Sequence, residues 1–160
     1  MAGRSGKDEK RAATPTLGNP KARWRYEILE KLECGISLVG PEVKSLREGR
    51  GSIEEAYARF RGRELWLVGM RIDEYGSTGY ARHDPARARK LLAHRHELDE
   101  LRIEVERRGL TLVPLRVYWS DRGIAKVEIA LVKGRKVHDK RQVDKERSAK
   151  REMDRAMRRK

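Results

Sequence analysis

The chain of 160 residues contains a single cysteine, Cys34, so it can form neither an intrachain disulfide nor a cysteine-based metal site. No stretch approaches the roughly 18 consecutive apolar residues of a membrane span. Residues 1–19 also lack the apolar segment of an export signal. These absences predict a protein of a reducing compartment, the cytoplasm, with no membrane partner.

Catalytic motifs are missing as well. The sequence has no phosphate-binding glycine loop, no nucleophile elbow and no Asp/Glu cluster of the kind that holds magnesium. His94 and His96 could form a metal pair, but no third ligand follows at a recognisable spacing. Glu42, Glu54 and Glu55 have no evident convergent partner and are interpreted as solvated carboxylates. We therefore expect no catalytic residue, no metal and no cofactor.

Positive charge is abundant, and it is concentrated at the two ends of the chain. The formal net charge is +14. Residues 1–23 hold 6 basic and 2 acidic side chains, and residues 133–160 hold 13 basic and 5 acidic ones, whereas the middle has 20 and 18. A membrane-surface helix would need large apolar anchors, and the two ends offer only Met153, Met157 and small residues. RNA is the partner that this distribution favours.

The basic tail, residues 133–160, contains too little apolar surface to offset the entropy of its own ordering. We expect it to be disordered on its own. If residues 143–160 are wound into a helix, Ala149, Met153, Ala156 and Met157 fall on one side. The tail should therefore become helical only against a partner surface.

Apolar and polar residues alternate in the middle of the chain, which is typical of half-buried strands. Residues 24–38 predict a strand bent at Gly35, with one lapse on each face, at Glu30 and at Leu29; Cys34 is interpreted as a structural thiol on its apolar face. Residues 56–68 predict a hairpin with its turn at Gly62-Arg63. A second hairpin is predicted over 111–131, with the odd-numbered residues 111–119 sharing one face.

Three short helices are predicted among these strands. Pro41 near a helix start and Gly49 just past its end mark the first. Asp84-Pro85 resembles a cap followed by the first helical position and predicts a second helix through Leu92. Leu98, Leu101 and Val105 mark a third, which ends at Gly109.

Six antiparallel strands of this size need closure, because open edges would invite pairing with other chains. We predict a mainly β fold with short helices: a small OB-like, six-stranded antiparallel β-barrel with about three helices. Its predicted organisation is a flexible basic arm (1–18), an RNA-binding barrel (19–132) and the basic tail (133–160).

Two features of the residues themselves suggest RNA contacts. Tyr75 and Tyr80 flank a glycine-containing loop, where tyrosines either stack on bases or pack on the rim of a barrel. Basic residues also crowd the stretch that leads to His94. Mixed charge on a helix is usually plain solvated surface, but this crowding favours a face that contacts phosphates.

Several long motifs resemble the SsrA-binding protein family, also called small protein B (SmpB), in order and spacing. They are "NPKARWRY", "ISLVGPEVKSLREG", "HDPARARKLLAHRHEL", "LVPLRVYW" and "AKVEIALVKGRKVHDKR", and they extend from about Asn19 to Arg141. The resemblance implies a bacterial, non-catalytic RNA-binding protein with an OB-like barrel. The chain departs from the family pattern at Pro20, where a basic residue is usual, and at Trp24, where histidine is common.

The resemblance also implies a function. Such a protein, acting as a monomer, binds the tRNA-like domain of transfer-messenger RNA (tmRNA, or SsrA RNA). It delivers this RNA to stalled ribosomes for trans-translation, and its tail occupies the small-subunit decoding centre and the mRNA channel. The ribosome is thus the partner on which the tail is expected to become helical. An alternative that the residues leave open is a ribosome-associated or translation-factor-like RNA-binding module that is not specific for tmRNA.

Residue roles follow from the same resemblance. Glu33 is expected to support the RNA-binding face, Leu92 to be needed for binding, and His138 to stack on a base of the decoding centre. The predicted contacts with tmRNA are Glu33, Lys44, Arg89, Lys90, Leu92 and His94. The predicted ribosome-contacting residues of the tail are Gly134, Lys136, His138, Asp139, Lys140, Arg141 and Met153.

Overall fold

The computed structural model describes residues 16–76, 83–135 and 137–159, with the side chains of 137–139 left out. The elements in chain order are β1 Leu17–Gly18, α1 Ala22–Arg25, β2 Tyr26–Ile36, α2 Gly40–Arg47, β3 Gly51–Ser52, β4 Tyr57–Arg61, β5 Glu64–Val68, β6 Arg71–Ile72, β7 Arg89–Leu92, α3 Arg95–Arg108, β8 Thr111–Trp119, β9 Ala125–Gly134 and α4 Val137–Arg158.

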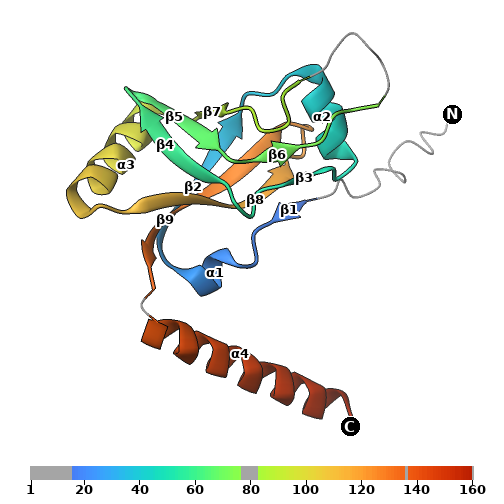
Figure 1. The fold of residues 1–160 in the computed structure, drawn as a ribbon, viewed down its shortest axis with the longest axis vertical. Coiled ribbons are helices and arrows are strands. Elements are labelled where there is room, and N and C mark those ends of the chain that lie inside the picture. Colours follow the sequence, from blue (N-terminus) through green and yellow to red (C-terminus); the bar gives the residue numbers. More distant parts are fainter. Residues whose placement is uncertain (1–15, 77–82, 136, 160) are drawn as a thin grey trace, which may run out of the picture.

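The strands pair in a closed ring, β8–β4–β5–β7–β2–β9, and β9 returns to β8 (Figure 1). Every pairing is antiparallel. β1 adds to β8 beside β4, while β3 and β6 form a separate two-stranded ribbon. The predicted six-stranded, OB-like barrel is thus confirmed, and closure leaves its main strands without a long free edge. Its strands begin at Leu17 and end at Gly134.

The barrel interior is filled by side chains that point inward from alternate residues of each strand. Leu65 and Leu67 of β5, Leu91 of β7 and Val127 and Ile129 of β9 are all at most 1 % exposed. Burying each such side chain contributes roughly 1.5–3 kcal/mol. Cys34 is buried among them, and burial, with the nearby carboxylates of Glu97 and Glu33, raises the pKa of its thiol to about 12. It is a structural thiol, as predicted.

Both predicted hairpins are confirmed. Gly62 makes the β4–β5 turn with a φ of 61°, a conformation that suits glycine. In β8, however, the odd-numbered residues do not share one face, because a bulge between Pro114 and Arg116 shifts the register with β9. As a result Val113 and Leu115 pack with Ala22 in a second cluster, and that cluster seats α1 on the outside of the barrel.

β2 departs from its predicted form in two respects. Trp24 belongs to α1 and not to the strand. The irregularity expected at Gly35 lies instead between Ile28 and Glu30, where the register with β9 shifts. Both lapses in the sequence pattern lie at this bulge, where Leu29 and Glu30 are exposed.

Two of the three predicted helices are confirmed, as α2 and α3, and the one predicted over 84–92 is wrong. Asp84 instead forms a turn, accepting hydrogen bonds from the backbone N–H of Ala86 and of Arg87. The residues that follow form β7, which pairs with β5 on one side and β2 on the other. Pairing with β5 and β2 closes the barrel at this position and thus overrides the local helical signal, as tertiary context often does.

The tail forms a helix, α4, that runs away from the barrel (Figure 1). Its described side chains from Asp144 onward are all exposed. That the tail is disordered when free stays a prediction. No helix among the described residues has the length and apolar character needed to cross a membrane.

Candidate RNA-binding surface

Three predicted RNA contacts from distant parts of the sequence meet in one depression on the barrel. Glu33 of β2, Leu92 at the end of β7 and His94 at the start of α3 line it, together with Gly35, Ala93, Glu97, Leu32 and Lys126. Antiparallel pairing explains the meeting, because Gly35 lies opposite Leu92. A Cβ atom added at Gly35 would lie 3.4 Å from the Leu92 Cβ, so the two positions are in direct contact across the strands.

Glu33 is held in place by a residue that the sequence did not reveal as functional. The hydroxyl of Tyr118 in β8 donates a hydrogen bond to the Glu33 carboxylate. Burial, that hydrogen bond and the charge of Glu33 raise the pKa of Tyr118 to about 12, so the phenol stays protonated at neutral pH. The carboxylate is therefore oriented before any ligand arrives.

The Arg116 guanidinium lies 4.4 Å from the centroid of the Tyr118 ring and 3.0 Å from the Glu128 carboxylate. Lys31 approaches the same carboxylate at 3.7 Å. These residues form a row across three strands, since Arg116 pairs with Glu128 and Glu128 with Glu33. Sequence reasoning missed the row, although the register of the second hairpin was a signal that could have found it.

The outer face of β7 contributes one further predicted contact. Lys90 shares that face with Leu92, and its ammonium lies 2.8 Å from the Glu64 carboxylate. Both side chains of this pair are 40–45 % exposed, so the pair is worth at most about 1 kcal/mol and a phosphate could replace the carboxylate. Lys90 is thus available to RNA beside the depression.

Arg89 is not available, and its prediction as an RNA contact is contradicted by its burial. Its side chain is 0 % exposed and forms an ion pair at 2.8 Å with Glu42, which is also 0 % exposed. The guanidinium donates further hydrogen bonds to the carbonyls of Met70 and Pro85. Arg89 points inward because residues alternate along β7, and it ties that strand to α2.

Glu42 was interpreted as a solvated carboxylate, and that interpretation is wrong. It accepts hydrogen bonds from Arg87, Arg89 and the backbone N–H of Val39. Burial alone would raise the pKa of Glu42, but these donors together hold it below its ordinary value. Glu54 and Glu55, by contrast, are partly or largely exposed and pair with Lys21 and Arg25.

Of the other predicted contacts, Lys44 lies apart from the depression. Lys44 is exposed on α2, with its ammonium 5.5 Å from the Tyr75 ring centroid. His94 is exposed, and its ring stacks on that of His96 at 5.8 Å between centroids. Within the ranges that the structure describes, no three His, Cys, Asp or Glu side chains gather as a metal site would require.

In the tail, Gly134 ends β9, Lys140 contacts the Trp24 ring, and Arg141 and Met153 are exposed. Lys136, Tyr80 and the side chains of His138 and Asp139 lie outside the described residues, as does most of the arm, 1–15.

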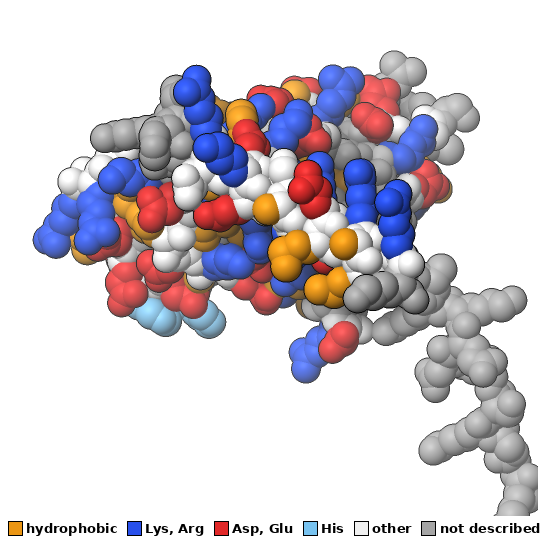
Figure 2. Space-filling view, turned by 90° about the horizontal axis from the view of Figure 1, so that it is seen from below, with side chains coloured by type: hydrophobic (Ala, Val, Ile, Leu, Met, Phe, Trp, Pro, Cys, Tyr) orange, Lys and Arg blue, Asp and Glu red, His pale blue; other side chains and the backbone are white. Residues whose placement is uncertain are grey.

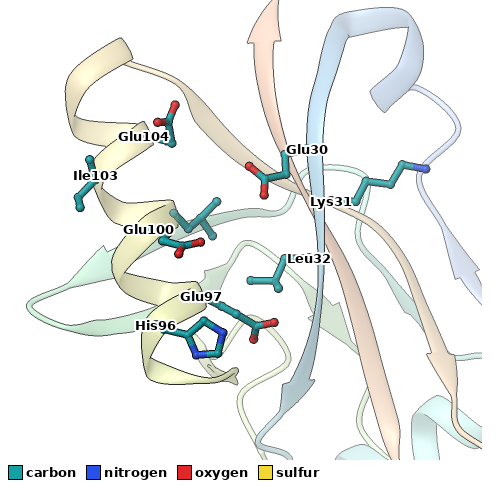
Figure 3. A pocket seen from close by; sticks show the side chains of 9 residues that line it. Glu30, Lys31, Leu32, His96, Glu97, Glu100, Ile103 and Glu104 are labelled. Atoms are coloured by element: carbon teal, nitrogen blue, oxygen red, sulfur yellow. The ribbon is translucent and has the colours of Figure 1, made fainter.

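A second hollow, between β2 and α3, has the opposite character (Figure 3). Glu30, Glu97, Glu100 and Glu104 line it, with Leu32 at its floor, while Lys31 points away. Four carboxylates repel phosphates, so this hollow is unsuited to RNA. On the face shown in Figure 2, acidic and basic side chains are interspersed. A surface of mixed charge is therefore suited to selecting a partner by shape and specific contacts more than by a uniform positive field.

These features place the chain in a class of protein, the small OB-like barrels, whose outer strands and loops commonly bind nucleic acid. A family model described as SmpB protein matches residues 16–159. The chain belongs to the SmpB protein family.

Its relatives include the SsrA-binding protein of Rhodopirellula baltica, 54% identical over 92% of this chain and 84% of that one. The SsrA-binding protein of Rhodopseudomonas palustris strain TIE-1 is 47% identical over 92% of this chain and 94% of its own. A solved chain described as "tmRNA-SmpB: a journey to the center of the bacterial ribosome" is 50% identical. It superposes with a TM-score of 0.64 over 77% of this chain and 86% of that one.

Proposed function

We propose that this protein binds the tRNA-like domain of tmRNA and delivers it to stalled ribosomes for trans-translation. Its similarity to SsrA-binding proteins over most of its length supports the RNA partner. The similarity to a chain solved with tmRNA on the bacterial ribosome supports the place of action, which is the cytoplasm. The protein acts by binding and not by catalysis.

The observation that carries the proposal is the depression where Glu33, Leu92 and His94 meet. Leu92 is 51% exposed there, beside the Tyr118-oriented carboxylate of Glu33 and the ammonium of Lys126. An exposed apolar side chain next to fixed polar groups suits an unstacked base and its ribose better than a bare phosphate chain. Lys90 and Lys126 add cations at the margin. We assign tmRNA binding to this depression.

The tail, in this proposal, enters the empty decoding centre and mRNA channel. Deleting all residues after Gly134 should then leave binding to the tRNA-like domain within about threefold of the full chain and abolish peptide tagging. A gel-shift assay and a tagging assay on stalled ribosomes measure the two. Loss of specific RNA binding on truncation would make the tail a binding arm and overturn its assignment to decoding.

The depression itself is tested by Leu92→Asp, which should weaken the tmRNA complex about 10- to 100-fold, or roughly 1.4–2.7 kcal/mol. A carboxylate placed there meets the RNA's own negative charge. The matched control is Leu29→Asp, because Leu29 is also an exposed leucine, at 43%, and lies on the bulge of β2. Equal binding by the two variants, both folded in a thermal melt, would remove Leu92 from the site.

The alternative, a translation-factor-like module without this RNA, is separated by sizing the RNA that co-purifies with the protein from cells. One RNA of tmRNA length supports the proposal. A mixture of ribosomal fragments without tmRNA supports the alternative.

A further inference from the structure

The short helix α1 is fixed firmly to the barrel, although it has only one turn. The backbone N–H of Asn19 donates to the Leu115 carbonyl at 2.9 Å, and the Asn19 side-chain amide donates to the Pro114 carbonyl at 3.1 Å. Ala22 is 1% exposed and packs in the cluster with Val113. An element anchored through buried backbone and side-chain groups keeps one orientation on the barrel.

The chain that leaves β9 is tied to the end of this helix. Gly134 makes the last pairing with Tyr26, the first residue of β2. Arg135 then donates twice, from its backbone N–H to the Arg25 carbonyl at 3.2 Å and from its Nε to the Tyr26 carbonyl at 3.1 Å. The exit of the tail is thus defined up to the residue before Lys136.

Trp24 continues the contact onto α4. The Lys140 ammonium lies 5.2 Å from the centroid of the half-buried indole ring, within the range of a cation–π interaction. Around it, α1 and α4 enclose a small hollow lined by Pro20, Lys21, Trp24, Arg25, Asp144 and Arg147. Past Arg147, every described side chain of α4 is exposed. Contact with the barrel is therefore confined to the first turns of the helix.

We propose that Trp24 is a positioning residue for the tail: together with Arg135 it sets the direction in which the first turns of α4 leave the barrel. The inference rests on the proposed function of the tail. A tail that must reach one narrow channel gains from a root with fixed direction, because fewer orientations are lost on entry. The distal helix, whose described side chains are exposed, needs no such constraint.

The direction of α4 can be measured without any assay of function. In a Cys34→Ala background, Arg59→Cys on β4 and Lys150→Cys on α4 carry nitroxide labels, since both positions are exposed and neither contributes to the contacts above. Pulsed electron paramagnetic resonance then gives the distribution of distances between barrel and tail. With Trp24 present we expect one main population.

Trp24→Ala should lower the ratio of docked to undocked tail by about 2- to 5-fold, which is what one exposed cation–π contact provides. Trp24→Phe should restore much of the wild-type distribution, because it keeps an aromatic face. Arg23→Ala is the control, since Arg23 is exposed on the same helix. Equal distributions for Trp24 and its alanine variant would overturn the proposal, as would a fully broad distribution in the parent protein.

The same variants are then compared for tmRNA binding and for tagging. Unchanged tmRNA binding with reduced tagging by Trp24→Ala, rescued by Trp24→Phe, supports a positioning role. Wild-type tagging despite a broadened distribution would overturn it. Failure of the parent protein to bind tmRNA would instead reject the proposed function and leave the measured docking of α4 standing.

Discussion

The barrel and α4 are built from the same chain but depend on different sources of stability. The barrel buries an apolar interior between strands that are paired on both sides. α4 also has an apolar side, but Met153 and Met157 on that side are 61% and 71% exposed. Burial of apolar surface is the dominant favourable term in folding, so the barrel has an internal source of stability that α4 lacks. This difference is the basis of the prediction that α4 packs against a surface outside this chain.

The charges of the two regions differ in the same way. In the barrel, many ionic groups are paired with groups of opposite charge, and the most important pairing is the buried cluster of Glu42 with Arg87 and Arg89. In the tail, cations outnumber carboxylates, and the described residues from Arg141 on have no ion pair. Unmatched cations near one another repel, so they favour a partner rich in phosphate.

The largest effect is expected from breaking the matched charges of the barrel. Glu42→Ala leaves the Arg89 guanidinium buried without its carboxylate and should lower the free energy of unfolding by about 3–5 kcal/mol. Urea unfolding followed by tryptophan fluorescence measures it. Glu64→Ala is the control, because its pair with Lys90 is exposed and should contribute no more than about 1 kcal/mol. Equal losses in the two variants would mean that burial of the Glu42 pair has no special weight.

A second change should break the tail and spare the barrel. Met153→Pro preserves every charge but costs about 3 kcal/mol in a helix interior. We expect an unchanged barrel melt, normal tmRNA binding and loss of peptidyl transfer to tmRNA. The helical circular dichroism of the free protein should fall only if the free tail is helical. Met153→Leu, which keeps both a good helix former and a large apolar side chain, is the control. Full tagging by the proline variant would mean that the tail works as an extended basic strand.

The regular parts of the fold were predictable because each is specified by nearby residues. Alternation predicted both hairpins, and glycines past the helix ends predicted where α2 and α3 stop. β7 was misread as a helix because four residues carry little periodicity, and its pairing with β5 and β2 depends on residues far away in sequence. Arg89 was misplaced for the same reason, since its partner Glu42 lies 47 residues earlier.

The residues of the candidate site likewise fall into those that were predicted and those that were not. Glu33, Leu92 and His94 were predicted only through resemblance to a family, and pairing of β2 with β7 then brings them together. Tyr118 and Lys126 were not predicted, because their place beside Glu33 and Gly35 follows from the registers of β8 and β9. Such neighbours are visible in a sequence only after the strand pairing is known.

The smallest effect on the stability of the free protein is expected from a change in α4, and it tests the comparison of the barrel with α4 most directly. Met153→Ala combined with Met157→Ala removes two large apolar side chains, a change that costs 2–5 kcal/mol for each residue in a packed core. Because both are largely exposed on α4, we expect the free energy of unfolding to change by less than about 0.5 kcal/mol. Leu65→Ala, at a buried position of β5, is the matched control and should show the full cost.

On the ribosome the same double variant should behave differently, because alanine keeps the helix but removes the apolar stripe that would pack against a channel wall. We expect normal tmRNA binding and a tagging rate reduced several-fold. Wild-type tagging would mean that charge alone seats the tail. A loss of more than about 1 kcal/mol of stability in the free protein would contradict the comparison itself, since the methionines would then be buried against the barrel, and α4 would belong to the fold as fully as the strands do.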